Sequence, residues 1–321
     1  MSTPLVAVAD SVFPSLDPAK EILAELKAEV RLAAEPTPEA ILDVARQADG
    51  LLVTYAKITG DMIRQLERCR VISRFGIGVD NIDLVAAAKA GIVVTYVPDY
   101  CVDEVSDHAM ALLLALARKV TYANQLVQGG RWEMKAVVPL YRLRGRVLGL
   151  VGLGKIPRAL VPKAQAFGLK VIASDPYVSA EAAAQLDVTL VDFEQLLQQA
   201  DYVSIHAPLT PETHHLFNAN VFKLMKSEAL LVNTARGPLV DVEALAAALD
   251  QGQLAGAALD VMPVEPPPAD SPLLGRDNVI VTPHTGFYSE QALLDLQTKA
   301  ATDLARVLSG KSPRYPVNPP G

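Results

Sequence analysis

The chain has 321 residues, of which half are hydrophobic and 20% are charged, and its formal net charge is −7. This length exceeds that of one ordinary domain, so two domains with apolar cores are expected. The acidic balance is not offset by any basic block, which excludes the electrostatic surface of a nucleic-acid-binding protein.

Short β-like runs alternate with helical patterns in the first hundred residues. The strand candidates are rich in Val, Leu, Ile and Ala, and they cover residues 5–9, 30–33, 51–55, 71–75 and 92–97. Amphipathic helical stretches lie between them, at 19–28, 38–47 and 61–68. Strict alternation of strand and helix predicts a parallel sheet with helices on both faces.

A long helical pattern follows, from Val102 to about Gln128, and Gly129-Gly130 ends it. A helix of this length between two alternating regions is expected to cross from one domain to the other. Alternation then resumes with strand candidates at 147–151, 171–174, 188–191, 202–206, 230–233, 257–261 and 279–282, before a final helical pattern at 289–308. The predicted fold class is α/β, with two doubly wound parallel-sheet domains.

A glycine-rich turn, Gly152-Leu-Gly154-Lys155-Ile156, follows one of these strand candidates and opens a helical pattern. The first glycine permits a tight turn, and the second lets a pyrophosphate approach amide donors at the helix N-terminus. The third glycine of this fingerprint is Pro157 here, which removes one amide. Lys155 either offsets that loss by its charge or is an ordinary solvated lysine.

Asp175 ends the next strand candidate, at the distance expected for a carboxylate that binds the ribose of a dinucleotide. A carboxylate accepts hydrogen bonds from both ribose hydroxyls but repels a 2′-phosphate. Pro176 and Tyr177 follow without a cation that would bind such a phosphate. The sequence therefore predicts NAD rather than NADP.

Three apolar runs in the second half of the chain lead to Arg236, Glu265 and His284. Because the carboxyl ends of parallel strands meet at one edge of a sheet, we expect these side chains to converge there. Arg236 suits a substrate carboxylate, His284 transfers a proton, and Glu265 holds the imidazole and favours its protonated form. Beside a nicotinamide this predicts hydride exchange with a 2-keto or 2-hydroxy acid. His206 lacks an acid partner and is expected only to line the cofactor cleft.

The two cysteines, Cys69 and Cys101, lack metal-ligand spacing and favour a reducing cytoplasm over a disulfide framework. No signal peptide is visible, and the apolar helical stretch from Ala109 to Ala117 is too short to span a bilayer. The pair His214-His215 has no accompanying acid or cysteine, so no metal site is expected. A cytoplasmic protein without membrane or nucleic-acid partners is predicted.

Six motifs occur together in the chain, namely Gly152-Leu-Gly-Lys-Ile156, His206-Ala-Pro-Leu-Thr-Pro-Glu-Thr213, Asn233-Thr-Ala-Arg-Gly-Pro-Leu-Val240, Gly256-Ala-Ala-Leu-Asp-Val261, Glu265-Pro266 and Pro283-His284. With these motifs the chain resembles the D-isomer-specific 2-hydroxyacid dehydrogenases over nearly its whole length. The resemblance implies an NAD-dependent oxidoreductase in which Arg236, Glu265 and His284 are catalytic. The segments at 98–105 and 284–290 resemble the branch near the C-terminal-binding-protein corepressors.

The resemblance also implies a Rossmann cofactor domain (101–285) inserted into a flavodoxin-like substrate domain (1–100 plus 286–321), with a cleft that closes by hinge motion. Family members are usually dimers built around the helix that begins near Val102, so a homodimer is expected. Asp260 would receive the nicotinamide carboxamide. The implied cofactor-binding residues are Gly152, Gly154, Lys155, Ile156, Asp175, Ala207, Thr213, Thr234, Ala235, Arg236, Asp260 and His284. The implied substrate-binding residues are Tyr55, Ile77, Gly78, Arg236 and His284.

Two other functions stay open at this point. An NAD(H)-sensing protein of the corepressor kind would need none of the three catalytic residues. A formate- or phosphite-type dehydrogenase of the same fold would take a very small anion. The sequence excludes neither, and it does not predict which 2-keto acid the enzyme would reduce or the physiological direction of the reaction.

Overall fold

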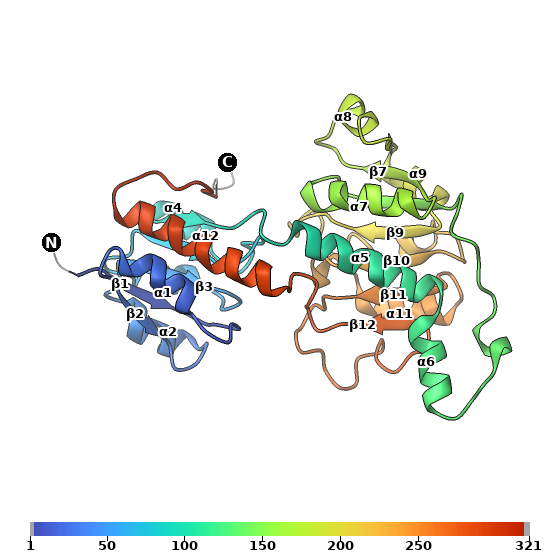
Figure 1. Cartoon of the computed structure of the whole chain (residues 1–321), viewed down its shortest axis with the longest axis horizontal. Coiled ribbons are helices and arrows are strands. Elements are labelled where there is room, and N and C mark those ends of the chain that lie inside the picture. Colours follow the sequence, from blue (N-terminus) through green and yellow to red (C-terminus); the bar gives the residue numbers. More distant parts are fainter. Residues whose placement is uncertain (1–2, 318–321) are drawn as a thin grey trace. The chain divides into compact units, whose positions relative to one another are not determined.

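The computed structural model describes residues 3–317 and divides into two compact units (Figure 1). The N-terminal unit contains the residues up to Tyr100 and those from Ser289 onward, and the central unit is Cys101–Tyr288. The chain therefore leaves the N-terminal unit and returns to it with its last helix. Residues 1–2 and 318–321, which the sequence assigns to the substrate domain, lie outside the described residues.

The N-terminal unit is built on a parallel sheet with the strand order β2-β1-β3-β4-β5. Its strands are β1 (Leu5–Val8), β2 (Glu29–Leu32), β3 (Gly50–Val53), β4 (Val71–Arg74) and β5 (Val93–Thr95). Its helices are α1 (Asp17–Ala24), α2 (Pro38–Ala45), α3 (Gly60–Ile63), α4 (Leu84–Lys89) and α12 (Glu290–Leu308). This order is that of the flavodoxin-like class.

Helix α12 completes the N-terminal unit although it lies at the far end of the sequence. Ser289 caps it by accepting the Ala292 N–H at 2.9 Å. The helix packs on α1 and β4, and its Leu304 lies so close to Gly50 that a Cβ there would approach the leucine to 3.2 Å. The C-terminal segment is therefore part of the first hydrophobic core.

The central unit is built on a longer parallel sheet with the order β12-β11-β10-β9-β6-β7-β8. Its strands are β6 (Val147–Val151), β7 (Lys170–Ser174), β8 (Thr189–Leu190), β9 (Tyr202–Ile205), β10 (Leu230–Asn233), β11 (Gly256–Leu259) and β12 (Val279–Val281). Its helices are α5 (Val102–Ala117), α6 (Val120–Gln128), α7 (Lys155–Ala166), α8 (Ala180–Ala184), α9 (Phe193–Gln199), α10 (Ala219–Phe222) and α11 (Val242–Asp250), with short 3₁₀ helices η1 (Met134–Val137) and η2 (Gly237–Leu239).

The strand order of the central sheet reverses between β6 and β9, where β6 continues to β7 on one side and β9 to β10 on the other. Such a switch point opens a crevice outside the carboxyl ends of the strands, which is where ligands of doubly wound sheets bind. The predicted fold class, two doubly wound parallel-sheet domains, is confirmed.

The predicted single helix over 102–128 is wrong in one respect, because it is two helices. Helix α5 ends at Ala117, and α6 begins at Val120. Between them Lys119 adopts a left-handed backbone with φ of 52°, which a continuous right-handed helix does not allow. Neither Gly nor Pro occurs at the break, so the sequence carries no signal for it.

Within residues 3–317, no helix combines the length and the apolar character that crossing a membrane requires.

Candidate active site

The register of the central sheet brings three strand ends to one level. Asn233, the last residue of β10, pairs with Leu259 at the end of β11, and Leu259 pairs with Val281 at the end of β12. Arg236, Asp260 and His284 follow these ends. The sheet therefore places the loops that carry them at the same edge.

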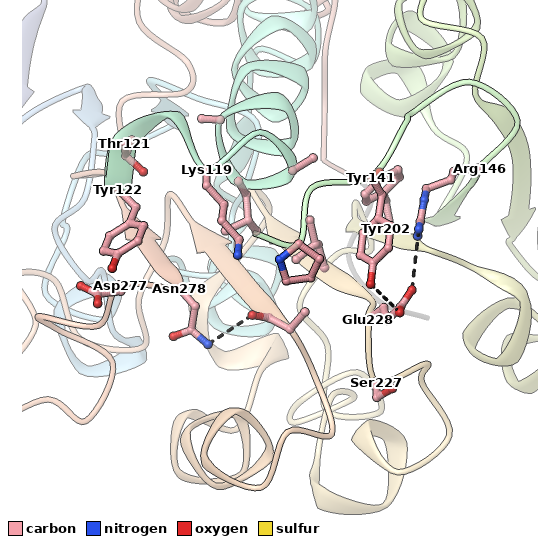
Figure 2. Close-up of a pocket in the computed structure, with 16 residues that line it drawn as sticks. Lys119, Thr121, Tyr122, Tyr141, Arg146, Tyr202, Ser227, Glu228, Asp277 and Asn278 are labelled. Carbon is pink, nitrogen blue, oxygen red and sulfur yellow. Dashed lines mark hydrogen bonds and ion pairs between the residues drawn. The ribbon is translucent and has the colours of Figure 1, made fainter. Parts of the chain in front are cut away.

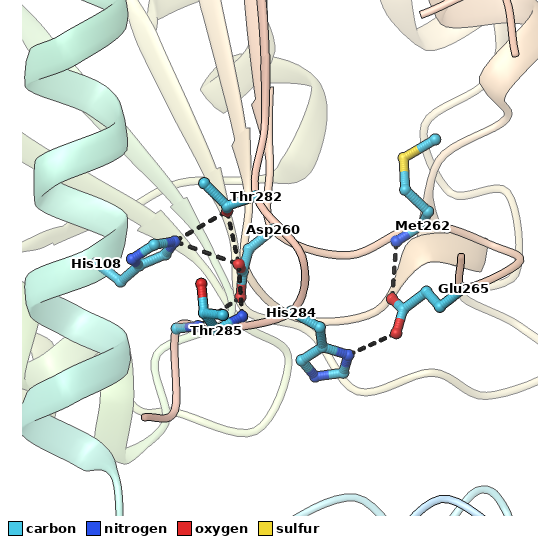
Figure 3. A network of polar contacts seen from close by, with 8 residues as sticks. His108, Asp260, Met262, Glu265, Thr282, His284 and Thr285 are labelled. Atoms are coloured by element: carbon cyan, nitrogen blue, oxygen red, sulfur yellow. Dashed lines mark hydrogen bonds and ion pairs between the residues drawn. The ribbon is translucent and has the colours of Figure 1, made fainter. Parts of the chain in front are cut away.

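His284 and Glu265 form an ion pair at this edge, as Figure 3 shows. His284 Nδ1 lies 2.7 Å from Glu265 Oε2, while Glu265 Oε1 accepts the Met262 N–H at 2.9 Å. Burial raises the pKa of Glu265, but the hydrogen bond and charge of His284 and the Met262 amide outweigh it, so the pKa lies below its usual value. An ionised Glu265 places a proton on Nδ1 and leaves Nε2 as the atom that exchanges protons.

The backbone of His284 is held in an uncommon conformation. Its φ is +53°, in the left-handed region, which stores strain of about 1 kcal/mol or more for a residue other than glycine. Its N–H donates to the carbonyl oxygens of Asp260 at 2.8 Å and Thr282 at 3.0 Å. The Asp260 carboxylate then accepts the next two amides, from Thr285 at 2.9 Å and Gly286 at 2.8 Å. Asp260 therefore fixes the loop on both sides of the imidazole.

Arg236 stands on a loop that Asn233 shapes from within the core. The fully buried Asn233 donates its Nδ2 to the Arg236 carbonyl at 2.9 Å and accepts the Ala235 N–H at 3.0 Å. The next residue, Gly237, packs directly on the chain at Met262, since a Cβ would lie 2.0 Å from the Met262 carbonyl carbon. The Arg236 loop is thus pressed against the segment whose amide orients Glu265. Asn233 is not among the site residues predicted from the sequence, although a polar residue that ends a buried strand is a usable signal.

The glycine turn lies at the switch point, after β6. Gly152 has a φ of +95°, and a Cβ on it would approach the His206 carbonyl oxygen to 2.9 Å, so only glycine fits there. Gly154 caps α7 and faces open space. Pro157 is buried in the first turn of α7, where a missing N–H leaves no helical hydrogen bond unmade. Lys155 is exposed at the helix start.

Asp175 follows β7 and ties this turn to its neighbour. Its Oδ2 accepts the Leu153 N–H at 2.8 Å, and its Oδ1 accepts the Tyr177 N–H at 2.8 Å. Each carboxylate oxygen accepts about two hydrogen bonds, so this bonding leaves capacity for ribose hydroxyls. The turn, the open space at Gly154 and the carboxylate are a set of groups that fit a dinucleotide.

The remaining predicted cofactor residues lie on neighbouring strand ends. Ala207 follows His206, whose ring lies 2.9 Å from the Ser204 hydroxyl and whose pKa burial lowers to about 4, so it is neutral at pH 7. Thr213 donates to the Pro208 carbonyl at 2.7 Å and closes the turn after β9. Within residues 3–317 the Thr234 hydroxyl is a buried polar atom without a hydrogen-bond partner. An orphaned hydroxyl at this edge is what a polar ligand would satisfy.

The predicted substrate residues Tyr55, Ile77 and Gly78 belong to the N-terminal unit, at the carboxyl ends of β3 and β4. The Asp10 carboxylate accepts the amides of Thr54 at 2.7 Å, Tyr55 at 2.6 Å and Ala56 at 3.1 Å.

The Tyr55 ring lies 5.9 Å from the guanidinium carbon of Arg74, whose Nη1 donates to the Phe75 carbonyl at 2.7 Å. Both loops of this edge are therefore held in defined conformations.

A hollow of about 430 Å³ in the central unit lies away from these residues (Figure 2). Its walls include Arg146 before β6, Tyr202 at the start of β9 and Asn278 before β12. It therefore sits at the amino ends of the strands, opposite to the edge that carries Arg236 and His284. In the part of the chain that is described, no cluster of three or more His, Cys, Asp and Glu side chains is arranged to hold a metal ion.

Comparison with known proteins identifies relatives of this chain. Residues 110–286 match the sequence model of the D-isomer specific 2-hydroxyacid dehydrogenase, NAD binding domain. A D-3-phosphoglycerate dehydrogenase of Methanocaldococcus jannaschii is 41% identical over 309 residues, covering 96% of this chain and 58% of the relative. A glyoxylate reductase of Thermococcus litoralis is 37% identical over 290 residues, covering 88% of this chain and 87% of the relative. This chain thus spans only about half the length of the phosphoglycerate dehydrogenases it matches.

Solved structures are similar over almost the entire chain. The TT0316 protein from Thermus thermophilus superposes with a TM-score of 0.89 at 36% identity, covering 98% of this chain and 100% of that one. A D-lactate dehydrogenase from Aquifex aeolicus, solved with NAD and lactic acid, superposes with a TM-score of 0.85 at 27% identity, covering 95% and 96% of the two chains.

Proposed function

Because the chain belongs to the D-isomer specific 2-hydroxyacid dehydrogenase family, we propose that it is an NAD(H)-dependent enzyme that reduces a 2-keto acid to a 2-hydroxy acid. The observation that carries this proposal is the 2.7 Å pair of His284 and Glu265. It stands beside the Arg236 loop, on the edge of a sheet whose switch point carries the glycine turn. A proton donor, a cation and a dinucleotide site are the parts that such a reduction needs.

His284 and Arg236 divide the chemistry between them. Arg236 forms a bidentate pair with the substrate carboxylate and orients the adjacent carbonyl. When bound, NADH supplies the hydride that the carbonyl carbon accepts. The carbonyl oxygen takes the proton from His284 Nε2, and Glu265 stabilises the imidazolium before that transfer. His284 then regains its proton from water.

The cofactor is NAD rather than NADP on the strength of Asp175. Its carboxylate stands where the ribose of a dinucleotide lies in this class of fold, and it would repel a 2′-phosphate. The orphaned Thr234 hydroxyl and Asp260 follow β10 and β11 at the nicotinamide end. Gly152, Gly154, Lys155 and Ile156 cradle the pyrophosphate, with Ala207, Thr213 and Ala235 along the remaining strand ends.

In this proposal the substrate domain is residues 1–100 plus 286–321, which include the N-terminal unit, and residues 101–285 are the NAD-binding domain. The amides of Ile77 and Gly78 bind the substrate carboxylate, and Tyr55 forms a wall of the pocket. Both cysteines are buried and neither forms a disulfide, and burial raises the pKa of Cys69 to about 12. Buried cysteines outside any disulfide support a cytoplasmic location. The resemblance to the corepressor branch stays a prediction.

A screen of NADH oxidation tests the proposed activity. The purified protein is assayed with glyoxylate, hydroxypyruvate, phenylpyruvate and sugar-derived keto acids, each with NADH and with NADPH. We expect turnover of at least one acid, with a higher kcat/KM for NADH because of Asp175. Dinucleotide binding without turnover of any acid would contradict the proposal and favour an NAD(H)-sensing protein.

We also propose that the protein is a homodimer that pairs through the segment after α5. Trp132 is 89% exposed and Met134 is 74% exposed, and Val120, Val127 and Val138 are exposed nearby. Such a concentration of exposed apolar side chains is typical of a protein–protein interface. The hollow of Figure 2 borders this segment, with Lys119, Thr121 and Tyr122 in its wall.

Replacing Trp132 with alanine tests the dimer. Because a tryptophan at the centre of an interface contributes about 2 kcal/mol or more, the dimer Kd should rise roughly 30-fold. Light scattering across a dilution series measures this, with the exposed Val85 of α4 changed to serine as the matched control. A monomeric wild-type protein would overturn the proposed dimer, and an equal shift in both variants would show that the interface is elsewhere.

A further inference from the structure

His108 lies in the second turn of α5, far in the sequence from every predicted catalytic residue. We propose that it is a positioning residue, which holds Thr282 and one oxygen of the Asp260 carboxylate in place and so keeps the other oxygen directed at the nicotinamide carboxamide. This inference rests on the proposed function. It assigns a role to a residue that none of the motifs contains.

The hydrogen bonds determine which atoms of the His108 network donate (Figure 3). His108 Nε2 lies 3.0 Å from the Thr282 hydroxyl and 3.2 Å from Asp260 Oδ1. Thr282 donates its single hydroxyl proton to Asp260 Oδ1 at 2.6 Å, so its oxygen is left to accept. His108 therefore donates from Nε2 toward both Thr282 and Asp260.

The two oxygens of Asp260 are used unequally. Oδ1 receives donors from His108, Thr282 and the Thr285 amide, whereas the described residues supply Oδ2 with the Gly286 amide. A carboxylate oxygen accepts about two hydrogen bonds, so Oδ1 is saturated and Oδ2 retains capacity for one more donor. The NH₂ of a carboxamide is such a donor.

Packing holds this arrangement rigidly. Asp260 is 2% exposed, and a Cβ on Gly286 would lie 2.8 Å from its Oδ2 and 3.2 Å from His108 Cδ2. The Gly286 backbone thus closes over both side chains. Burial alone would raise the pKa of Asp260, but the hydrogen bonds from His108, Thr282, Gly286 and Thr285 lower it by more, so the pKa lies below its usual value. The carboxylate is therefore ionised and a strong acceptor at neutral pH.

The register of the sheet places a second polar group beside Asp260. Asn233 pairs with Leu259, so Thr234 and Asp260 occupy neighbouring positions past the ends of β10 and β11. The Thr234 hydroxyl is one of the buried side-chain groups that have no hydrogen-bond partner among residues 3–317. An acceptor with spare capacity next to an orphaned hydroxyl matches a carboxamide, which both donates and accepts.

Binding of two ligands to two His108 variants tests this role without relying on activity. His108→Leu keeps the bulk and removes the donor, whereas His108→Gln keeps an N–H donor. The Kd values of NADH and of ADP-ribose, which lacks the nicotinamide, are measured by calorimetry. Because a hydrogen bond to a charged group contributes about 1.5 kcal/mol, His108→Leu should weaken NADH binding about tenfold and leave ADP-ribose within about twofold. His108→Gln should restore most of the NADH affinity.

The outcomes separate the two proposals. Equal weakening of NADH and ADP-ribose in His108→Leu, or no weakening of either, would overturn the role of His108. A wild-type protein that binds neither ligand would instead overturn the proposed function. Should His108→Leu not fold, Thr282→Val breaks the same link from the other side, and it must show the same difference between NADH and ADP-ribose for the inference to stand.

Discussion

Replacing His284 with asparagine is expected to lower kcat about 10³-fold, because general acid catalysis by a positioned imidazole contributes about 10²–10⁴-fold. Asparagine is chosen because it tolerates the left-handed backbone that His284 adopts, with φ of +53°. The change therefore removes the proton donor without adding backbone strain. The Glu265 carboxylate would lose its ring partner, so Glu265→Gln in the same background should add little.

The matched control for this variant is His215→Asn. His215 has nearly the same backbone, with φ of 52°, and its side chain is 45% exposed, next to Asp241. The same substitution in the same conformation should leave kcat unchanged. ADP-ribose affinity confirms that both variants are folded. Retention of kcat within tenfold of the wild type in His284→Asn would show that another group donates the proton.

Much of the fold could be predicted because its cause is local. Runs of Val, Leu, Ile and Ala separated by amphipathic stretches require parallel strands with helices on both faces, and this is the architecture found. The order of the strands in each sheet could not be predicted from these local patterns. Whether β9 lies beside β6 or beyond β8 depends on which crossover buries more apolar surface, and no single run of residues encodes that choice.

The residues of the candidate site also fall into those that the sequence predicts and those that only the structure reveals. Arg236, Glu265 and His284 could be proposed because each follows an apolar run, and parallel strands bring their ends together. His108 could not, because a histidine on an apolar helix predicts packing, and its partner Thr282 is 174 residues away. Asp260 was expected to bind the cofactor, but its second task, holding the loop around His284, follows only from the hydrogen bonds of its carboxylate and carbonyl. The left-handed backbone of Lys119 likewise has no signature in side-chain chemistry.

Replacing Arg236 with glutamine is expected to lower kcat/KM for the keto acid about 10²–10⁴-fold, since two hydrogen bonds between charged groups contribute about 3–6 kcal/mol. The guanidinium is aimed by its loop, where Nη1 donates to the Ala235 carbonyl at 2.8 Å and Asn233 holds the Arg236 carbonyl. Arg236→Lys keeps the charge but loses the planar fork, so it should recover only part of the loss. If charge alone binds the substrate carboxylate, the KM of the Arg236→Lys variant should rise by a larger factor than its kcat falls.

Arg276→Gln separates this effect from the general loss of a cation. Arg276 pairs with the exposed Asp250 at 2.7 Å and lies before β12, at the amino ends of the strands. Its loss should reduce the free energy of unfolding by at most about 1 kcal/mol and leave kcat/KM unchanged. Because both arginines belong to the central unit, steady-state assays of the two variants compare one cation at the carboxyl edge of the sheet with one at the amino edge. If Arg236→Gln and Arg276→Gln had equal activity, the substrate carboxylate would have to be bound by other donors, and the amides of Ile77 and Gly78 would then be the first to test.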